Sequence, residues 1–219
     1  MMENNKFKYK IENKRYHTWN YYLRQKFGTK VFKVSINAGF TCPNIDGSIS
    51  YGGCAYCSKD GSGDFAGNPR DNLVKQFKEI KEMMEKKWPQ AKYIGYFQAF
   101  TNTYAPLEVL KEKYETILDQ EGVIGLSIST RPDCIDDHIL DYLDDLNKRT
   151  NLWVELGLQT VHDKTSNIIN RGHGLDIFID CVNRLRSRGI EVVAHVINGL
   201  PGESHDMMME TISRVAQMN

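Results

Sequence analysis

Segments with the composition of β-strands alternate with helical segments along most of this 219-residue chain. Strands are expected at residues 31–37, 92–98, 123–129, 152–159 and 191–197. Helices are expected at residues 71–87 and 164–169, from Pro106, around Ile139 to Leu146, from Leu175 to a cap at Gly189, and from His205. In most of these helices, apolar side chains recur at spacings of three and four. Five strand–helix units in strict alternation predict a parallel α/β sheet, either barrel-like or doubly wound.

A loop of about 30 residues follows the first predicted strand, and it is rich in glycine. Loops of this length inside a compact domain are usually functional. In both parallel architectures, ligands bind at the carboxyl ends of the strands. We therefore expect the functional residues to lie in this loop and directly after the other strands.

The balance of charge argues against one class of function. The chain has 28 Lys and Arg side chains and 28 Asp and Glu side chains, and a protein without net charge is not expected to coat nucleic acid. No apolar stretch approaches the roughly 20 residues of a membrane span. The N-terminus also lacks the apolar core of roughly 7 to 15 residues that secretory signals contain. A cytoplasmic location without membrane association is therefore expected.

The start of the chain is basic and aromatic. Nine Lys or Arg side chains stand among the first 33 residues, against Glu3 and Glu12. Interleaved Tyr and Trp side chains could stack on RNA. The same spacing suits an amphipathic helix that closes one end of a barrel, and we favour this interpretation. We therefore divide the chain into an N-terminal extension, residues 1–30, and a core domain, residues 31–219.

Three of the five cysteines lie in the long loop with the spacing C-x11-C-x2-C: Cys42, Cys54 and Cys57. Soft sulfur ligands select zinc, copper(I) or an iron–sulfur cluster. A closed zinc site requires four ligands, and this loop has neither a histidine nor a fourth cysteine. Three thiolates suit a [4Fe-4S] cluster with one open iron, while zinc and unmetallated thiols remain as alternatives. Cys181 is expected to be a small buried residue, and Cys134 follows a strand.

This cysteine triad, with Tyr56 directly before Cys57, resembles that of the radical S-adenosylmethionine (radical SAM) superfamily. The gap of eleven residues departs from the common C-x3-C-x-aromatic-C pattern, but wider gaps occur in subfamilies related to the Elongator catalytic subunit. The string KVSINAGFTCPNIDGSISYGGCAYC is similar to the YhcC-like subfamily. The resemblance implies that the three cysteines ligate the cluster. Tyr56 would either contact the cofactor or pack beside the cluster.

Other segments resemble the same group and the oxygen-independent coproporphyrinogen oxidases. The string ELGLQT, followed by NRGHG, resembles a signature after the fourth strand. The resemblance implies that Gln159 and Arg171 approach SAM. Without it, Gln159 would cap the strand end and Arg171 would pair with an acid.

The remaining implied SAM contacts follow the second, third and fifth strands. STRPD resembles the relatives' third strand end and contributes Ser129 and Arg131, although several relatives carry a glutamate where this chain has Ser129. NGLPGE is similar to a turn against adenine and contributes Gly199 and Pro201. Gln98 stands where relatives often have a Gly-Gly-Glu-like turn. His173 and His195 are expected to be packed and are assigned no role.

The resemblance implies a partial TIM-type (β/α) barrel of parallel strands. The superfamily usually builds six strand–helix units, so a chain with five is expected to end before the sixth. The implied function is reductive cleavage of SAM by a [4Fe-4S] cluster, which gives a 5′-deoxyadenosyl radical that abstracts hydrogen from an unknown substrate. The resemblance permits a tRNA base or a small molecule such as a tetrapyrrole as that substrate, and it implies an electron donor such as flavodoxin or ferredoxin.

Two other classes of function remain open. A nucleic-acid-binding module could use the basic N-terminus together with a structural zinc in the cysteine loop, and its affinity would depend on salt. A simple iron–sulfur electron carrier would leave the motifs at the strand ends unexplained.

Overall fold

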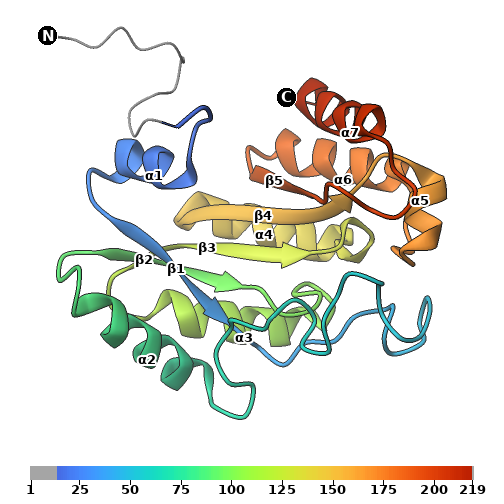
Figure 1. The fold of residues 1–219 in the computed structure, drawn as a ribbon. Coiled ribbons are helices and arrows are strands. Elements are labelled where there is room, and N and C mark those ends of the chain that lie inside the picture. The colour runs from blue at the N-terminus through green and yellow to red at the C-terminus, as the bar shows by residue number, and fades with distance from the viewer. Residues whose placement is uncertain (1–13, 219) are drawn as a thin grey trace, which may run out of the picture.

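The computed structural model describes residues 14–218. Residues 1–13, which include much of the predicted basic extension, lie outside the described residues, as does Asn219. The elements are α1 (Trp19–Phe27), β1 (Val31–Ile36), α2 (Leu73–Glu85), β2 (Lys92–Phe97), α3 (Leu107–Leu118), β3 (Val123–Thr130), η1 (Pro132–Cys134), α4 (Asp137–Arg149), β4 (Asn151–Gln159), α5 (Asp163–Ile168), α6 (Leu175–Ser187), β5 (Glu191–Val196) and α7 (His205–Gln217). Figure 1 shows their arrangement.

The predicted helices and strands are all present, and their ends differ by one or two residues from the predicted ones. Helix α2 begins at Leu73 because Asn72 caps it, with the Asn72 side chain accepting a hydrogen bond from the Lys75 amide. Gly189 follows α6 with a φ of 70°, the left-handed conformation expected of a helix-ending glycine.

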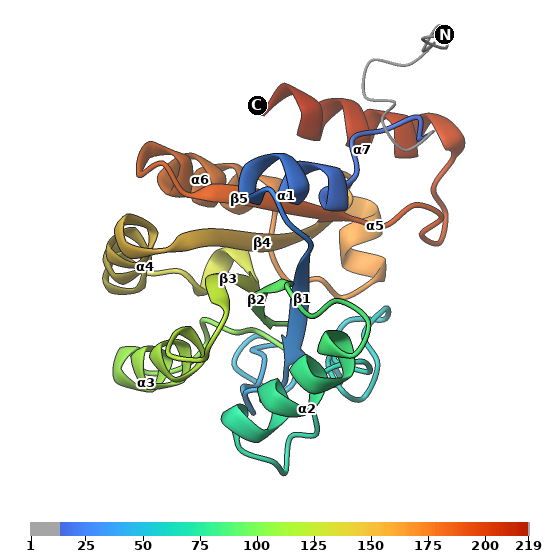
Figure 2. The same ribbon diagram turned by 90° about the vertical axis from the view of Figure 1, so that its left-hand side faces the viewer.

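The five strands form one parallel sheet in the order β1-β2-β3-β4-β5. A doubly wound sheet would reverse its strand order part-way, and this one does not. The strands form an arc with α2, α3, α4 and α6 on its outer side (Figure 2). In residues 14–218 the sheet stays open, with β1 and β5 at its edges. The predicted partial TIM-type barrel of five parallel strand–helix units is confirmed.

Strand β4 shows how the two faces of the sheet differ. Its even-numbered residues 152–158 are leucine or valine and are buried in the core beneath the outer helices. Its odd-numbered residues point to the opposite, inner face, because side chains alternate along a strand. They are Trp153, Glu155, Gly157 and Gln159. The inner face therefore changes from apolar to polar towards the carboxyl end of the strand.

Helix α1 packs at the amino ends of the strands. Leu23 is buried against Val31, Ile94 and Trp153, and the Trp19 ring meets the Trp153 ring edge-on with centroids 5.4 Å apart. Burial of these large side chains is what holds such a helix in place. A helix that packs against the strands is therefore present at residues 19–27, and its role in closing one end of the barrel stays a prediction.

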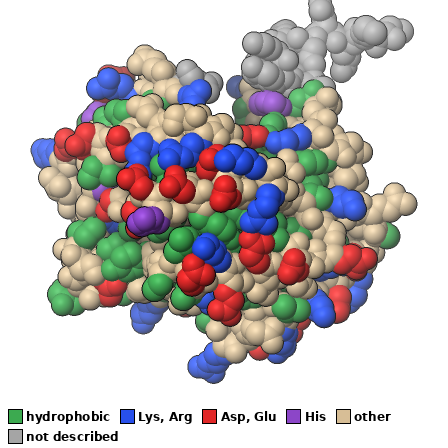
Figure 3. Space-filling model, turned by 180° about the vertical axis from the view of Figure 1, so that it is seen from behind, with side chains coloured by type: hydrophobic (Ala, Val, Ile, Leu, Met, Phe, Trp, Pro, Cys, Tyr) green, Lys and Arg blue, Asp and Glu red, His purple; other side chains and the backbone are tan. Residues whose placement is uncertain are grey.

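The face seen from behind carries positive and negative side chains side by side rather than a patch of one sign (Figure 3). Ion pairs join neighbouring outer helices, as between Arg184 and Asp137 and between Arg188 and Asp141. Exposed pairs of this kind contribute little to stability. None of the helices in residues 14–218 combines the length and the apolar composition that crossing a membrane requires.

Candidate active site

A cavity of about 260 Å³ opens at the carboxyl ends of the strands. Its wall includes most of the predicted site residues: Cys42, Cys54, Tyr56, Cys57, Gln98, Ser129, Arg131 and Gln159. These residues come from the loop after β1 and from the ends of β2, β3 and β4. The parallel direction of the strands brings these ends to one edge of the sheet.

The cysteine loop presents its three thiols to this cavity. Cys54 is buried, and the Asn44 amide donates a hydrogen bond to its sulfur over 3.2 Å. A hydrogen bond from Cys57, with smaller contributions from Tyr56 and Asn44, lowers the pKa of the Cys54 thiol despite its burial. A lowered pKa favours the thiolate, which is the form that binds metals.

Among the described residues, no three His, Cys, Asp or Glu side chains are grouped closely enough to hold a metal ion. The three cysteines nevertheless line the same cavity wall, and thiolate ligands suit an iron–sulfur cluster. Assignment of that cluster to them stays a proposal.

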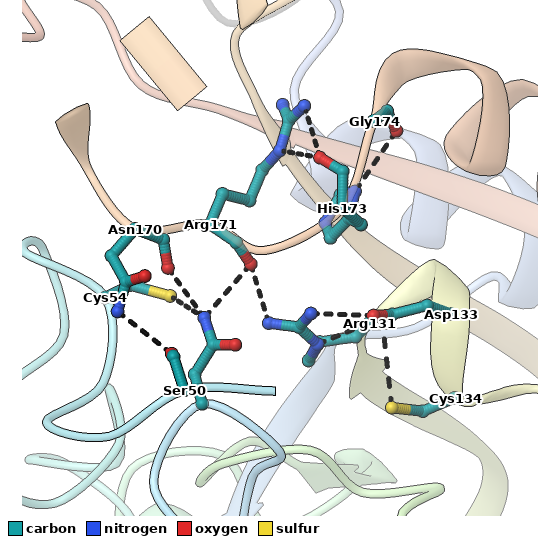
Figure 4. A network of polar contacts seen from close by, with 10 residues as sticks. Ser50, Cys54, Arg131, Asp133, Cys134, Asn170, Arg171, His173 and Gly174 are labelled. Atoms are coloured by element: carbon teal, nitrogen blue, oxygen red, sulfur yellow. Dashed lines mark hydrogen bonds and ion pairs between the residues drawn. The ribbon is translucent and has the colours of Figure 1, made fainter. Parts of the chain in front are cut away.

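A polar network ties the cysteine loop to the loop that precedes α6 (Figure 4). The Asn44 side-chain amide donates to the carbonyl oxygens of Asn170 and Arg171, over 2.6 and 3.0 Å. The Asn170 side chain donates in return to the Gly53 carbonyl over 2.8 Å. Arg131 also donates to the Arg171 carbonyl over 2.8 Å. Asn44 and Asn170 were missed by sequence reasoning, because nothing in their local pattern shows that the two loops meet.

Gln159 ends β4 in an unusual conformation. Its φ is 60°, which is uncommon for a residue with a side chain. The side chain lines the cavity, and its Oε1 atom is buried without a hydrogen-bond partner among the described residues. A Cβ at Gly157 would lie 2.6 Å from Gln159 Nε2, so a side chain at position 157 would displace the Gln159 amide group. An unpaired buried acceptor is costly unless a ligand or a bound water supplies the donor. Gln159 therefore fits a ligand that carries an N–H or O–H group, such as SAM.

The other strand ends are fixed by local contacts. Gln98 donates from its side-chain amide to the Ser62 carbonyl of the cysteine loop over 2.8 Å. The Ser129 carbonyl accepts from the Asn102 side chain over 2.8 Å. Arg131 forms a two-pronged ion pair with the Asp133 carboxylate, so its guanidinium is already engaged within the protein. Arg131 can line the site, but its charge is largely balanced before any ligand binds.

Arg171 is engaged with the backbone of the protein, and its contact with SAM stays a prediction. Only 1% of its surface is exposed, it is not part of the cavity wall, and its guanidinium donates to the backbone carbonyls of Leu158, Thr160 and His173. Among residues 14–218, no ion pair joins the Arg171 guanidinium to an acid. The side chain instead holds the end of β4 against the next loop.

Gly199 and Pro201 follow β5 outside the cavity wall. Gly199 has a φ of 85°, a conformation that favours glycine. Its amide donates to the Met208 sulfur of α7. Ile197, just before this turn, does line the cavity, so the turn adjoins the site without forming its wall.

Sequence reasoning missed the floor of the cavity, which Tyr96 and His195 line from positions further inside the barrel. His173 is buried as expected, but the expectation that His195 is packed is wrong, because 44% of its side chain is exposed. Alternation along β5 was the available signal, since it puts His195 on the same face as Ile197.

Sequence similarity to a known family distinguishes between the classes of function that the sequence left open. The family model described as the radical SAM superfamily matches residues 49–215. The chain belongs to the radical SAM superfamily. This is a superfamily of enzymes, so the expectation of an enzyme is confirmed at that level.

Two relatives in bacteria are similar over most of the chain. YtqA of Bacillus subtilis is 58% identical over 219 residues, which are 100% of this chain and 68% of YtqA. YhcC of Escherichia coli is 38% identical over 196 residues, which are 89% of this chain and 62% of YhcC. The resemblance to the YhcC-like subfamily is therefore confirmed. The chain spans about two thirds of the length of these relatives.

Among solved structures, the archaeal Elp3 of Methanocaldococcus infernus with an N-terminal deletion superposes with a TM-score of 0.57. The alignment covers 84% of this chain and 42% of Elp3 at 18% sequence identity. At this identity the likeness shows a shared fold alone.

Proposed function

We propose that this chain is the catalytic core of a radical SAM enzyme, in which Cys42, Cys54 and Cys57 hold a [4Fe-4S] cluster and the adjoining cavity holds SAM. The observation that carries the proposal is that these cysteines line one cavity at the strand ends together with Gln159, whose Oε1 atom is buried without a hydrogen-bond partner among the described residues. Membership of the superfamily supports it independently. A zinc-stabilised nucleic-acid-binding module and a simple electron carrier would leave the Gln159 acceptor unexplained.

When bound, the cluster and SAM supply an electron-driven cleavage that yields a 5′-deoxyadenosyl radical, which abstracts hydrogen from the substrate. The chain's own part is to bind the cofactors, to orient the substrate and to exclude water. The three thiolates would hold the cluster, and Tyr56 would contact the cofactor or pack beside the cluster. Gln159 Oε1 accepts a hydrogen bond from SAM, and Gln98 and Ser129 flank it from neighbouring strand ends.

The remaining predicted SAM contacts differ in how close they lie to the cavity. Arg131 lines the cavity and contributes shape and a neutralised charge. Gly199 and Pro201 would reach the adenine only from the adjoining turn. Arg171 would act on SAM indirectly, by holding the carbonyls at the end of β4.

The proposed substrate is a tRNA base or a free small molecule, the two classes that the sequence resemblance implies. The proposed electron donor is a flavodoxin or a ferredoxin, because the cleavage needs one electron from outside. These partners belong to the whole protein, of which the relatives show a longer form.

The test is anaerobic purification, reconstitution with iron and sulfide, and chromatographic measurement of 5′-deoxyadenosine after addition of SAM and dithionite. The proposal expects a broad cluster absorption and product that requires both SAM and reductant. One bound zinc and no iron would contradict it in favour of the zinc module. A cluster that is reduced without any product would indicate an electron carrier.

A Gln159→Leu variant is expected to bind SAM about tenfold more weakly, because it loses a hydrogen bond to a charged ligand but keeps its volume. Isothermal titration of the reconstituted protein with SAM measures this change, and the iron content should stay unchanged.

The matched control is Gln120→Leu, which removes a glutamine whose side-chain amide donates to the Thr116 carbonyl at the end of its own helix. Its SAM affinity should equal that of the wild type. Equal affinity in the Gln159 variant would show that SAM does not use this acceptor.

A further inference from the structure

Four strands contribute polar side chains to one cluster on the inner face of the barrel, at the floor of the cavity. Glu155 on β4 is its centre, with only 2% of its side chain exposed. Its Oε1 accepts hydrogen bonds from Lys33 on β1 and Ser127 on β3. Its Oε2 lies 2.7 Å from His195 Nε2 on β5. The longest-range hydrogen bond of the cluster, between Lys33 and Glu155, spans 122 positions of the sequence.

Glu155 is ionised at neutral pH. Burial raises the pKa of this carboxyl group, but hydrogen bonds from His195 and Lys33, the Lys33 charge and a hydrogen bond from Ser127 together lower it to about 2. An ionised carboxylate accepts hydrogen bonds and donates none. His195 Nε2 must therefore carry the hydrogen in the bond between them.

This bond fixes the tautomer of the histidine. In neutral imidazole one nitrogen carries the hydrogen and the other carries a lone pair. With the hydrogen on Nε2, the lone pair of His195 lies on Nδ1, for which no hydrogen-bond partner exists among the described residues. The ring lines the cavity and is 44% exposed on its side chain, so a bound molecule can reach it.

The other titratable groups around the histidine do not compete for this role. Burial and the nearby Glu155 charge raise the pKa of Tyr96, so its hydroxyl stays neutral. The Lys33 ammonium is engaged by Glu155 and lies 4.2 Å from the centre of the Tyr96 ring. If the role of His195 were purely structural, it would be to donate a hydrogen bond to the buried Glu155 carboxylate. Lys33 and Ser127 already donate two such hydrogen bonds. A half-exposed histidine on the cavity floor is therefore not explained by packing.

We propose that His195 is the acid–base residue for the substrate of this enzyme, with Nδ1 as the reacting atom and Glu155 as its positioning residue. This inference rests on the proposed function and deepens it, because it requires a substrate with a hydroxyl or N–H group at the cavity floor. The substrate's X–H bond breaks, its electron pair stays on X, and the proton bonds to Nδ1. The imidazolium that forms is balanced by the Glu155 carboxylate. The step transfers no electron.

A Glu155→Gln variant tests this arrangement. Lys33 and Ser127 both donate, so they retain the amide oxygen, and the amide nitrogen turns to His195 Nε2. His195 Nε2 must then accept a hydrogen bond from this amide. The histidine hydrogen therefore moves to Nδ1, and the lone pair that faced the cavity is lost. Nitrogen-15 NMR of the full chain, in reduced and iron-free form, is expected to show the Nε2–H tautomer in wild type and the Nδ1–H tautomer in the variant.

Controls make this NMR result specific. A His195→Gln variant identifies the signal by its loss. Glu191→Gln changes a different carboxylate, on the same strand as His195, which bonds to Tyr22, Lys26 and Trp153; it should leave the His195 tautomer unchanged. An Nδ1–H tautomer in the wild type would overturn the proposal even if the Glu155 variant did not fold.

Diethyl pyrocarbonate, which modifies unprotonated imidazole nitrogen, provides the second measurement. Peptide mass mapping is expected to show His195 modified at least about tenfold more slowly in Glu155→Gln than in wild type, because the wrong tautomer blocks Nδ1. Equal rates would overturn the proposal.

Formation of 5′-deoxyadenosine without substrate distinguishes failure of the proposed function from failure of the acid–base role of His195. If wild type forms it but the tautomer and modification results are unchanged between variants, only the acid–base inference fails. If wild type forms none, the proposed function fails and the inference falls with it.

Discussion

We expect the triple variant Cys42→Ala, Cys54→Ala, Cys57→Ala to bind less than about one tenth of the iron that the wild type binds after reconstitution. The reason is that no thiolate is left on the cavity wall to bind iron. It is also expected to form no 5′-deoxyadenosine. The protein should stay folded, since Cys42 and Cys57 are only partly buried and Cys54 belongs to a loop. Iron and sulfide analysis, with circular dichroism for the fold, measures these changes.

Cys134→Ala is the matched control. Cys134 is also a partly buried free cysteine, but it lies outside the cavity wall. Its removal should leave iron content and product formation at wild-type levels. Iron that persists in the triple variant and disappears in the Cys134 variant would contradict the assignment of the cluster.

Arg171→Met is expected to lower the free energy of unfolding by about 3 kcal/mol, because buried carbonyl groups lose their charged donor. The guanidinium bonds the carbonyls of Leu158, Thr160 and His173, all in a region closed to solvent. Methionine fills similar space but donates no hydrogen bond. Urea unfolding of the full chain, followed by circular dichroism, measures the change.

Arg188→Met provides the comparison for Arg171. Arg188 forms an exposed ion pair with Asp141, so its loss should cost less than about 1 kcal/mol. If Arg171→Met instead kept full stability and weakened SAM binding, the direct cofactor contact implied by the sequence resemblance would be right.

The order of strands and helices, and the place of the functional residues after the strands, could be predicted from the sequence. Apolar periodicity and turn residues act over neighbouring positions, so a single chain displays them. Parallel strands then bring their carboxyl ends together whatever the side chains are. For this reason Cys42, Ser129 and Gln159, which are far apart in sequence, could be expected at one site before their contacts were known.

The partners of individual side chains were decided only by the tertiary structure. A motif match could place Arg171 beside the cofactor, but the carbonyls that surround its guanidinium come from the end of β4 and its own loop. The cavity floor depends even more on distant segments, since Glu155 meets Lys33 across 122 residues and His195 across 40. Local sequence determined which segments form strands and which loops follow them. The charge, tautomer and exposure of these buried groups depend on contacts between strands, which no local pattern encodes.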